Sequence, residues 1–482
     1  MTASLAAREV IAPIDRAEAA VRPGSTVRVD VVARTRKVGH FFPGGTVDSF
    51  DVWLELKAED ATGKIFYWNG WIADDGKGPV DPGAHFYRSV MVDEHGNRID
   101  KRNAWSTRAV AYARLIPPGA ADTAHFRVKI PADAQGPIKL TARMNYRKFS
   151  WYYTNFAYAG MRDPSKPGPV DKSFDDGNFL FAADTSQVSG QIKAIPDLPI
   201  IVVAEDVKTI ATGPKPASPA PDPKDRERWN DYGIGLLLQR DFKGAAAAFE
   251  KVTEIEPGYA DGWVNRARVA VEEGEHARAV GLLEEALKRN PALASAHYFM
   301  GVGLKSFGRY DEALDHLQKT SAAFPRDRVV LNAIGRIFFL KRRFADSVAA
   351  FRKTLLVDPE DLAAHYNLML AYRGLHDEEK AKVHESLYLR FKADETSQFL
   401  TQAFRLLNPD DNRERQPVHE HDSTWTPEAL EAASMYHHGR PRPLLAAAPA
   451  VTNPSKTGSG TVSSGETVPD PVSPVSRTGE RR

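Results

Sequence analysis

A period of 34 residues begins at Arg226 and recurs five times, and it constrains the fold more than any other feature of the chain. Positions 8 and 20 of the period are small, positions 4 and 24 are large, and position 32 is proline in the first four copies. The small positions include Gly233, Ala267, Gly301 and Gly335, then Ala245, Ala279, Ala313 and Ser347; the prolines are Pro257, Pro291, Pro325 and Pro359. Small residues let two helix backbones approach, and proline ends the second helix. The period predicts stacked pairs of antiparallel helices, because one pair cannot bury its apolar face alone.

This pattern resembles the tetratricopeptide repeat, with four regular copies and a fifth that departs from the pattern after Tyr388. The resemblance implies an α-solenoid over 226–400 whose first helices line a concave, protein-binding groove. Matching the family's groove positions gives a candidate partner-binding set: Asn230, Arg268, Tyr298, Lys305, Asn332, Arg336, Tyr366 and Arg373. An alternative is that the two tyrosines pack between repeats.

The region 1–205 has the pattern of antiparallel strands. Apolar and polar residues alternate over 26–35, 51–58, 125–131 and 138–147, and Gly- and Pro-rich turns lie between such runs. In 51–58, Val52, Leu54 and Leu56 point one way, which leaves Glu55 on a face expected to be wet. This region predicts an antiparallel β-sandwich.

The remaining segments complete a multidomain chain in which β structure precedes α structure. A proline-rich linker is predicted at 206–225, where 213–223 reads GPKPASPAPDP. A histidine-containing extension is expected at 401–440, and 441–482 lacks aromatic residues and predicts a disordered tail.

Composition excludes several classes of function. The chain has 64 basic and 63 acidic residues, so no global charge favours nucleic acid. It has no cysteine, which excludes disulfides, thiolate metal sites and covalent CxxCH haem attachment. No apolar stretch approaches the ~20 residues of a membrane-spanning helix. Motifs of nucleophilic, phosphate-binding and zinc-peptidase sites are absent, so we expect no enzyme.

A second resemblance lies in the β region. The segment KVGHFFPGGTVDSFDVWLELKAEDATGK (37–64) resembles a domain of bacterial multihaem c-type cytochrome proteins, and 81–104, 143–149 and 412–421 fit the same group. The resemblance implies a c-type cytochrome as partner and a periplasmic location. The first residues do not form a signal peptide, so we expect a split or truncated relative, or otherwise a cytoplasmic protein.

Four histidines are candidate metal or haem ligands: His40, His85, His419 and His421. His419 and His421 flank Glu420, so in an extended segment both rings point to one side and could share a metal ion. A histidine of this chain could also ligate the haem iron of another segment, so ligation in trans remains open although no cofactor is expected in this chain alone. The alternatives are that His40 caps a turn and that 419–421 is a polar loop.

The sequence therefore favours a non-enzymatic scaffold that binds a partner protein in the repeat groove, associated with a c-type cytochrome system. The alternative is a haem- or metal-ligating redox protein that uses His40 and other histidines. A third possibility is a carbohydrate-binding sandwich that uses Trp151, Tyr152 and Tyr153.

Overall fold

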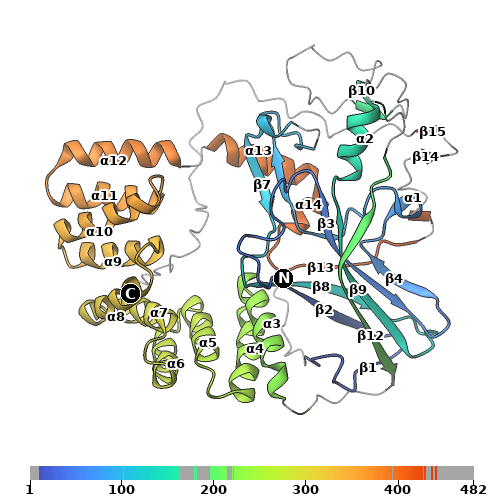
Figure 1. The fold of residues 1–482 in the computed structure, drawn as a ribbon, viewed down its shortest axis with the longest axis horizontal. Coiled ribbons are helices and arrows are strands. Elements are labelled where there is room, and N and C mark those ends of the chain that lie inside the picture. The colour runs from blue at the N-terminus through green and yellow to red at the C-terminus, as the bar shows by residue number, and fades with distance from the viewer. Residues whose placement is uncertain are drawn as a thin grey trace, which may run out of the picture. The chain divides into compact units, whose positions relative to one another are not determined.

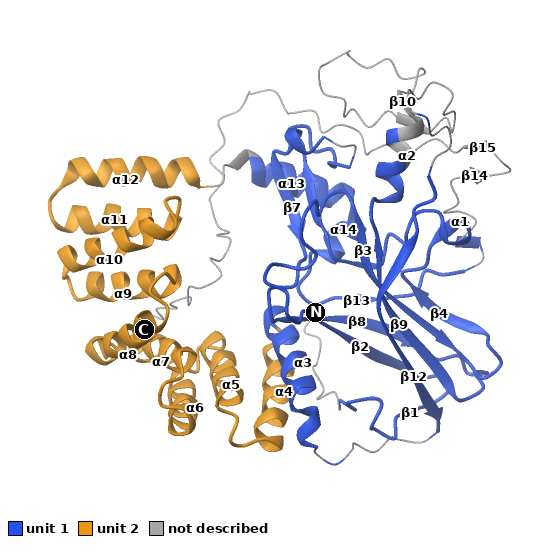
Figure 2. Cartoon of the chain, viewed as in Figure 1, with its two compact units in different colours: residues 1–240, 394–452 blue, residues 241–393, 453–482 orange. Residues whose placement is uncertain are grey.

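The computed structural model forms two compact units (Figures 1 and 2). The β unit contains the described residues of 1–240 and 394–452, and the repeat unit those of 241–393. The structure describes residues 10–100, 103–162, 179–181, 191, 196–213, 220, 222–392, 395–426, 428–429, 436–437 and 440–441. The first helix of the predicted repeat region, which ends before residue 240, thus lies in the β unit. The chain that follows the repeats, from residue 394 on, also belongs to the β unit. The predicted fold class, a β region followed by stacked helical pairs, is confirmed.

The larger sheet of the β unit has the strand order β1-β12-β9-β3-β4, with β5 paired to β3. Its strands are β1 (Ala20–Val21), β3 (Asp51–Glu59), β4 (Ile65–Asn69), β5 (His85–Phe86), β9 (Ile138–Arg147) and β12 (Ile200–Thr212). Its pairs are antiparallel except β1 with β12. Strand β12 includes 206–212, which the sequence had suggested as linker.

A second sheet has the order β13-β8-β2, with β2 (Thr26–Arg34), β8 (Ala121–Lys129) and β13 (Glu420–His421). Strand β8 is antiparallel to β2 and parallel to β13. Since β13 follows the repeats in sequence, the chain returns to the β unit after forming them. Smaller elements are β6 (Ser89–Val92) with β7 (Ala109–Ala113), β10 (Gly160–Arg162) with β11 (Phe179–Phe181), β14 (Tyr436–His437) with β15 (Arg440–Pro441), α1 (Ala73–Gly76) and α2 (Trp151–Ala159).

The core of the β unit lies between the two sheets, which curl toward each other. Val52, Leu54 and Leu56 of β3 pack in one cluster with Phe126 and Val128 of β8, as the alternation predicts. Both faces of β3 are covered.

The expectation of a wet face at Glu55 is wrong. Its side chain is buried, and two donors satisfy its oxygens there: Trp68 Nε1 donates to Oε1 at 2.9 Å and Asn145 Nδ2 donates to Oε2 at 2.8 Å. Alternation locates the apolar face but cannot show that a polar face is covered by later strands.

The repeat unit consists of helical hairpins. Its helices are α4 (Phe242–Ile255), α5 (Ala260–Glu272), α6 (His276–Arg289), α7 (Ala294–Ser306), α8 (Tyr310–Ala323), α9 (Arg328–Leu340), α10 (Phe344–Val357), α11 (Leu362–Gly374) and α12 (Glu378–Phe391). A Cβ atom on Gly301 would lie 2.6 Å from Leu317 Cγ, so the small eighth position is where paired helices cross. Ser347 Oγ donates to Gly335 O at 2.9 Å across the next such crossing.

Three further helices belong to the β unit. Helix α3 (Arg226–Leu238) packs on β8, helix α13 (Glu395–Leu407) packs on β7, and α14 (Pro409–Glu414) follows. Leu400 and Phe404 of α13 join a buried cluster with Val90 and Val92 of β6.

Two predictions fall outside the described residues, namely most of the proline-rich run at 214–221 and the tail beyond residue 441. Where the chain is described, none of its helices combines the length and the apolar character needed to cross a membrane.

Candidate metal centre and repeat surface

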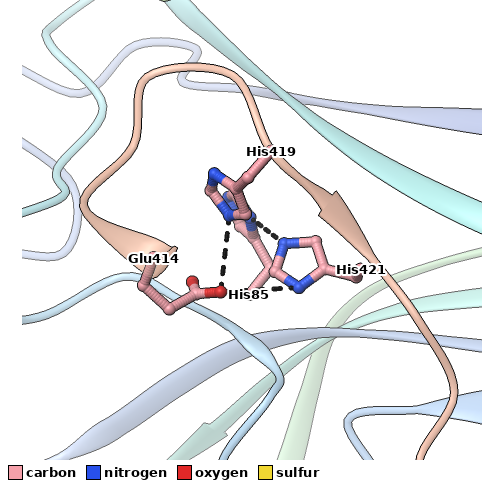
Figure 3. Close-up of side chains that lie close together, drawn as sticks. All are labelled: His85, Glu414, His419 and His421. Carbon is pink, nitrogen blue, oxygen red and sulfur yellow. Dashed lines mark hydrogen bonds and ion pairs between the residues drawn. The ribbon is translucent and has the colours of Figure 1, made fainter. Parts of the chain in front are cut away.

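Four side chains that can ligate a metal ion meet in the β unit: His85, Glu414, His419 and His421 (Figure 3). One ligand atom from each lies within 4.8 Å of the others. His85 begins β5, Glu414 ends α14 and His421 ends β13, so segments more than 300 residues apart in sequence supply the cluster. His85, Glu414 and His421 are buried, and the side chain of His419 is 8% exposed.

Strand pairing places these residues. In the larger sheet His85 lies opposite Leu54, and in the second sheet His421 lies opposite Phe126. We call residues 409–426 the strap. Tyr67 Oη donates to His421 O at 2.8 Å, and Ser423 Oγ donates to Trp68 O at 3.0 Å, so β4 holds the strap in place.

The outer ring nitrogens of the three histidines each contact an acceptor. His85 Nε2 donates to Asp122 Oδ2 at 2.8 Å, His419 Nδ1 to Gln416 O at 2.8 Å, and His421 Nδ1 to Gly83 O at 2.9 Å. A carbonyl or an ionised carboxylate cannot donate, so these contacts assign a proton to each outer nitrogen. In the neutral rings the inner nitrogens therefore carry lone pairs.

Two pairs of atoms face one another at the centre of the cluster, and the protonated His421 Nδ1 also lies 3.5 Å from Glu414 Oε1 (Figure 3). His85 Nδ1 lies 2.9 Å from His421 Nε2, and His419 Nε2 lies 3.4 Å from Glu414 Oε1. Glu414 Oε1 is buried, and no described residue gives it a hydrogen bond. Arg114 occupies the other side of the carboxylate, where its Nη1 donates to Oε2 at 2.6 Å.

The guanidinium of Arg114 also borders the histidines. Its Nη1 lies 3.4 Å from His85 Nδ1 and its Nη2 lies 3.5 Å from His419 Nε2, both too long for strong hydrogen bonds. Its Nη2 also donates to the Glu414 carbonyl. Arg114 thus orients Glu414 while leaving Oε1 directed at the imidazoles.

Burial keeps the imidazoles of His85 and His421 neutral. Burial, followed by the charge of Arg114, lowers the pKa of His85 to about 4, and burial lowers the pKa of His421 well below its ordinary value. Burial alone would raise the pKa of Glu414, but the adjacent guanidinium of Arg114 holds it well below the ordinary value of a carboxyl. The cluster therefore presents the neutral imidazoles of His85 and His421, the Nε2 of His419 and one carboxylate, which is a metal-ligand set.

The structure brings together three of the four histidines that the sequence proposed as ligands. His40 is not in the cluster, because its side chain is exposed and its Nδ1 donates to Phe41 O at 2.7 Å within its own turn. The sequence reading missed Glu414 and its partner Arg114. Glu414 and His419 are five residues apart within 412–421, and this spacing is the signal that could have marked Glu414 as a candidate ligand.

The inner helices of the repeat unit carry a row of cations, which we call the basic row: Arg268 on α5, Lys305 on α7 and Arg336 on α9. All three side chains are half-buried. Among the described residues, none of them has a carboxylate oxygen within 4.0 Å; the nearest anionic influence on Arg268 is Glu272 of its own helix.

Burial lowers the pKa of two of these cations, Arg268 and Lys305. The charge of Arg336 also lowers the pKa of Lys305. The guanidinium of Arg268 lies 5.6 Å from the Phe299 ring centre, and Arg336 Nη1 donates to Asn367 Oδ1 at 3.1 Å. The row is thus held in place by neutral groups and lacks close counter-charges.

The other predicted groove residues have varied surroundings. Burial raises the pKa of Tyr298 to about 12, so it stays a neutral hydroxyl beside the row. Asn332 Nδ2 donates to Asp361 Oδ1 at 3.1 Å, Arg373 pairs with Glu385 at 3.1 Å, and Tyr366 packs on Tyr388 at 5.4 Å between ring centres. Asn230 lies on α3, in the β unit.

The repeats match a known family. Two overlapping segments, 236–301 and 270–337, match the family model described as tetratricopeptide repeat. The chain carries tetratricopeptide repeats. This match and the helical pairs together support a protein-binding role for the repeat unit, and the family's members are typically non-enzymatic.

Curated relatives match about a quarter of this chain. The anaphase-promoting complex subunit cut9 of Schizosaccharomyces pombe is 25% identical over 28% of this chain and 20% of its own length. The small glutamine-rich tetratricopeptide repeat-containing protein 2 of Mycosarcoma maydis is 29% identical over 22% of this chain and 30% of its own length. The chain spans less than a third of either relative.

Solved structures of MamA are also similar. One is 20% identical and covers 35% of this chain and 92% of its own, with a TM-score of 0.32. The MamA fragment from Desulfovibrio magneticus RS-1 has a TM-score of 0.33 at 20% identity, covering 35% of this chain and 94% of its own.

Proposed function

We propose that this chain is a non-catalytic scaffold whose repeat unit binds an acidic, extended segment of a partner protein. The basic row carries the proposal, because Arg268, Lys305 and Arg336 are half-buried cations with no carboxylate oxygen within 4.0 Å in the described part of the chain. A carboxylate placed between Lys305 and Arg336 would relieve their mutual repulsion and would form charge-assisted hydrogen bonds. Tyr298 offers a neutral hydroxyl beside them.

Binding of a labelled peptide tests this function. The probe is a fluorescein-labelled 14-residue peptide of alternating Glu and Gly, compared with its Gln analogue. We expect the Glu peptide to bind and the double variant Lys305→Glu/Arg336→Glu to lose at least about tenfold in affinity, the equivalent of about 1.4 kcal/mol. The matched control reverses two exposed cations, Lys288→Glu and Lys251→Glu, which lie on second helices.

Equal binding of the Glu and Gln peptides, or equal loss in both double variants, would argue against an acidic partner. Circular dichroism at 222 nm checks that each variant retains its helices.

The finer proposal is that the partner belongs to a c-type cytochrome system in the periplasm. The resemblance of 37–64 to multihaem cytochrome proteins supports it. Haem staining of the proteins that the immobilised full chain retains from an envelope extract of its source organism should reveal a c-type cytochrome, and the Lys305→Glu/Arg336→Glu variant should retain less. Retention of other proteins without any haem-stained band would contradict the cytochrome link and leave the binding function standing.

A further inference from the structure

We propose that His85, Glu414, His419 and His421 bind one divalent first-row transition metal ion, which fastens the strap to the β unit. This goes beyond the proposed binding function, because it assigns a metal site to a unit outside the repeats. The observation that carries it is the hydrogen-bond pattern around the imidazole rings.

Two bare nitrogens face each other at the centre of the cluster. His85 donates its ring N–H to Asp122, and His421 donates its ring N–H to Gly83 O. The remaining nitrogens, His85 Nδ1 and His421 Nε2, are nevertheless only 2.9 Å apart. Two lone pairs at that distance repel unless a cation lies between or beside them. The guanidinium of Arg114, whose Nη1 lies 3.4 Å from His85 Nδ1, offsets part of this repulsion from the side, and a metal ion or an additional proton between the two nitrogens would remove it.

A second histidine pair in the same chain shows the ordinary solution. His297 Nε2 donates to Pro291 O at 2.9 Å, and its Nδ1 lies 2.8 Å from His316 Nδ1. The other nitrogen of His316 contacts no partner among the described residues, so His316 can adopt the tautomer that donates from Nδ1. His85 and His421 lack this freedom, since the outer nitrogens of both rings are engaged.

The further two ligands extend the same arrangement. His419 also donates its ring N–H to a backbone carbonyl, that of Gln416. Its other nitrogen, Nε2, lies 3.4 Å from Glu414 Oε1, which receives no hydrogen bond from the described residues. Metal–ligand bonds of ~2.0–2.2 Å put neighbouring ligand atoms roughly 3 to 3.5 Å apart. The two observed separations, 2.9 and 3.4 Å, match this spacing.

The outer contacts match the second shell of a metal site. Ligating histidines usually donate their other ring N–H to a carboxylate or a backbone carbonyl. Here Asp122, Gln416 O and Gly83 O accept those protons. These contacts fix the three rings before any ion arrives.

The chemistry and size of the site select the ion. Three imidazoles and one carboxylate favour Zn²⁺, Cu²⁺, Fe²⁺ or Ni²⁺ over Mg²⁺ and Ca²⁺, which prefer oxygen. Four ligand atoms that converge within 4.8 Å leave room for an ion and not for a porphyrin ring. With four protein ligands and nearly complete burial, the site is closed, which is typical of a structural metal.

Local charge also accommodates a divalent ion. Glu414 and Asp122 are anionic and Arg114 is cationic, so the groups around the site carry a net charge of about −1. Arg114 is bound to Glu414 Oε2 and lies outside the ring of ligand atoms. A dication would leave a total of about +1, compared with a proton's 0, so the charge count allows either cation and experiment must separate them.

The test uses the full chain, stripped with a chelator and dialysed, with Zn²⁺ alone as the probe. We expect one equivalent of Zn²⁺ to bind in competition with a colorimetric chelator and to raise the unfolding temperature in proportion to the logarithm of free Zn²⁺. Co²⁺ in its place should show the intense visible bands of a four-coordinate ion.

Three variants locate the site. His419→Gln removes the least buried ligand and should weaken Zn²⁺ binding more than tenfold, and Asp122→Asn should weaken it about 10- to 100-fold by releasing His85 from its tautomer. His40→Gln, which changes an exposed histidine outside the cluster, should leave the affinity unchanged.

The proposal fails if the folded wild-type chain binds no stoichiometric Zn²⁺, in which case a shared proton joins His85 and His421. It also fails if His419→Gln binds as tightly as the wild type. Should a variant not fold, the Co²⁺ spectrum of the wild type decides: the weak bands of six-coordinate aqueous Co²⁺ would overturn the proposal.

Discussion

Histidine serves different purposes in this chain according to what its two ring nitrogens contact. In the β unit His85 and His421 direct bare nitrogens into a buried cluster, whereas His40 caps a turn at the surface. The repeat unit contains two histidine pairs, and the members of each pair are 19 residues apart in sequence. The two Nδ1 atoms lie 2.8 Å apart in the pair His297–His316 and 3.0 Å apart in the pair His365–His384. Each repeat pair requires at least one neutral ring.

The repeat pairs predict acid sensitivity. Burial lowers the pKa of His297, and burial followed by the charge of His297 lowers that of His316. Because the unfolded imidazole titrates near ~6.5, the unfolded state binds more protons below that pH, and the stability of the repeat unit falls as the pH drops from about 6.5. Thermal unfolding followed at 222 nm should show this fall between pH 7 and pH 5.

The variant His316→Gln should reduce the effect. A glutamine amide can still donate to His297 Nδ1, but it cannot become charged. We expect its loss of unfolding temperature between pH 7 and pH 5 to be smaller than that of the wild type, by roughly 2–4 °C per kcal/mol of repulsion removed. The exposed control His95→Gln should follow the wild type; identical curves for all three proteins would refute the charge explanation.

At the scale of helices, the repeat crossings depend on residues without side-chain bulk. A Cβ atom on Gly335 would lie 2.8 Å from the ring of Phe351, a fully buried residue of α10. Gly281 lies on the exposed side of α6, where an added Cβ would meet nothing within 4 Å. An added methyl group should therefore lower the stability at residue 335 and should meet no obstacle at residue 281.

Substitution by alanine tests this contrast. Gly335→Ala should destabilise the repeat unit by about 1–3 kcal/mol, since the ring of Phe351 cannot move away in a packed core. Gly281→Ala should stabilise it by about 0.5–1 kcal/mol through helix propensity. Urea unfolding followed at 222 nm measures both.

A rescue variant checks the cause. Phe351→Leu should cost less in the Gly335→Ala background than alone, because the smaller side chain admits the new methyl group. Strict additivity of the two changes would show that the contact does not couple them.

At the scale of the whole molecule, the strap completes a unit whose other strands come before the repeats. Arg88 and Asp411 form an ion pair at 2.8 Å across 323 residues, and Tyr112 Oη donates to Asp411 Oδ1 at 3.1 Å. The side chain of Arg88 is only 14% exposed, and the carboxylate that compensates its positive charge comes from Asp411, beyond the repeats. The β unit can therefore be complete only after the repeats have been made.

Loss of this ion pair should weaken the β unit selectively. Asp411→Asn leaves Arg88 buried opposite a neutral group and should cost about 3 kcal/mol. Every tryptophan except Trp263 lies outside 241–393, so fluorescence follows the β unit while the 222 nm signal mainly follows the repeats. We expect the fluorescence transition alone to move to lower urea.

The matched control is a more exposed ion pair, which joins the strap to β8 and whose Glu420 side chain is 23% exposed. Arg127 Nε lies 2.9 Å from Glu420 Oε2, and Arg127 is 52% exposed. Glu420→Gln should change the stability by less than about 1 kcal/mol. A comparable loss in both variants would mean that burial does not decide the effect.

The helical pairs of the repeat unit can be predicted from the local sequence pattern. Its helices repeat every 34 residues, and contacts such as Gly301 with Leu317 join residues less than one period apart. Short-range packing leaves a visible period, so the pairs and their crossing residues can be predicted. The alternation of 51–58 and 138–147 determined two central strands in the same way.

The cluster of His85, Glu414, His419 and His421 and the extent of the β unit depend instead on contacts between distant segments. The alternation of 419–421 predicted that two rings share a side, but no local pattern pairs them with His85 or identifies Glu414 as the fourth ligand. These contacts depend on the registers of β5 and β13 in separate sheets. Such registers arise from the packing of distant segments, because each strand satisfies its backbone hydrogen bonds only where its neighbours lie.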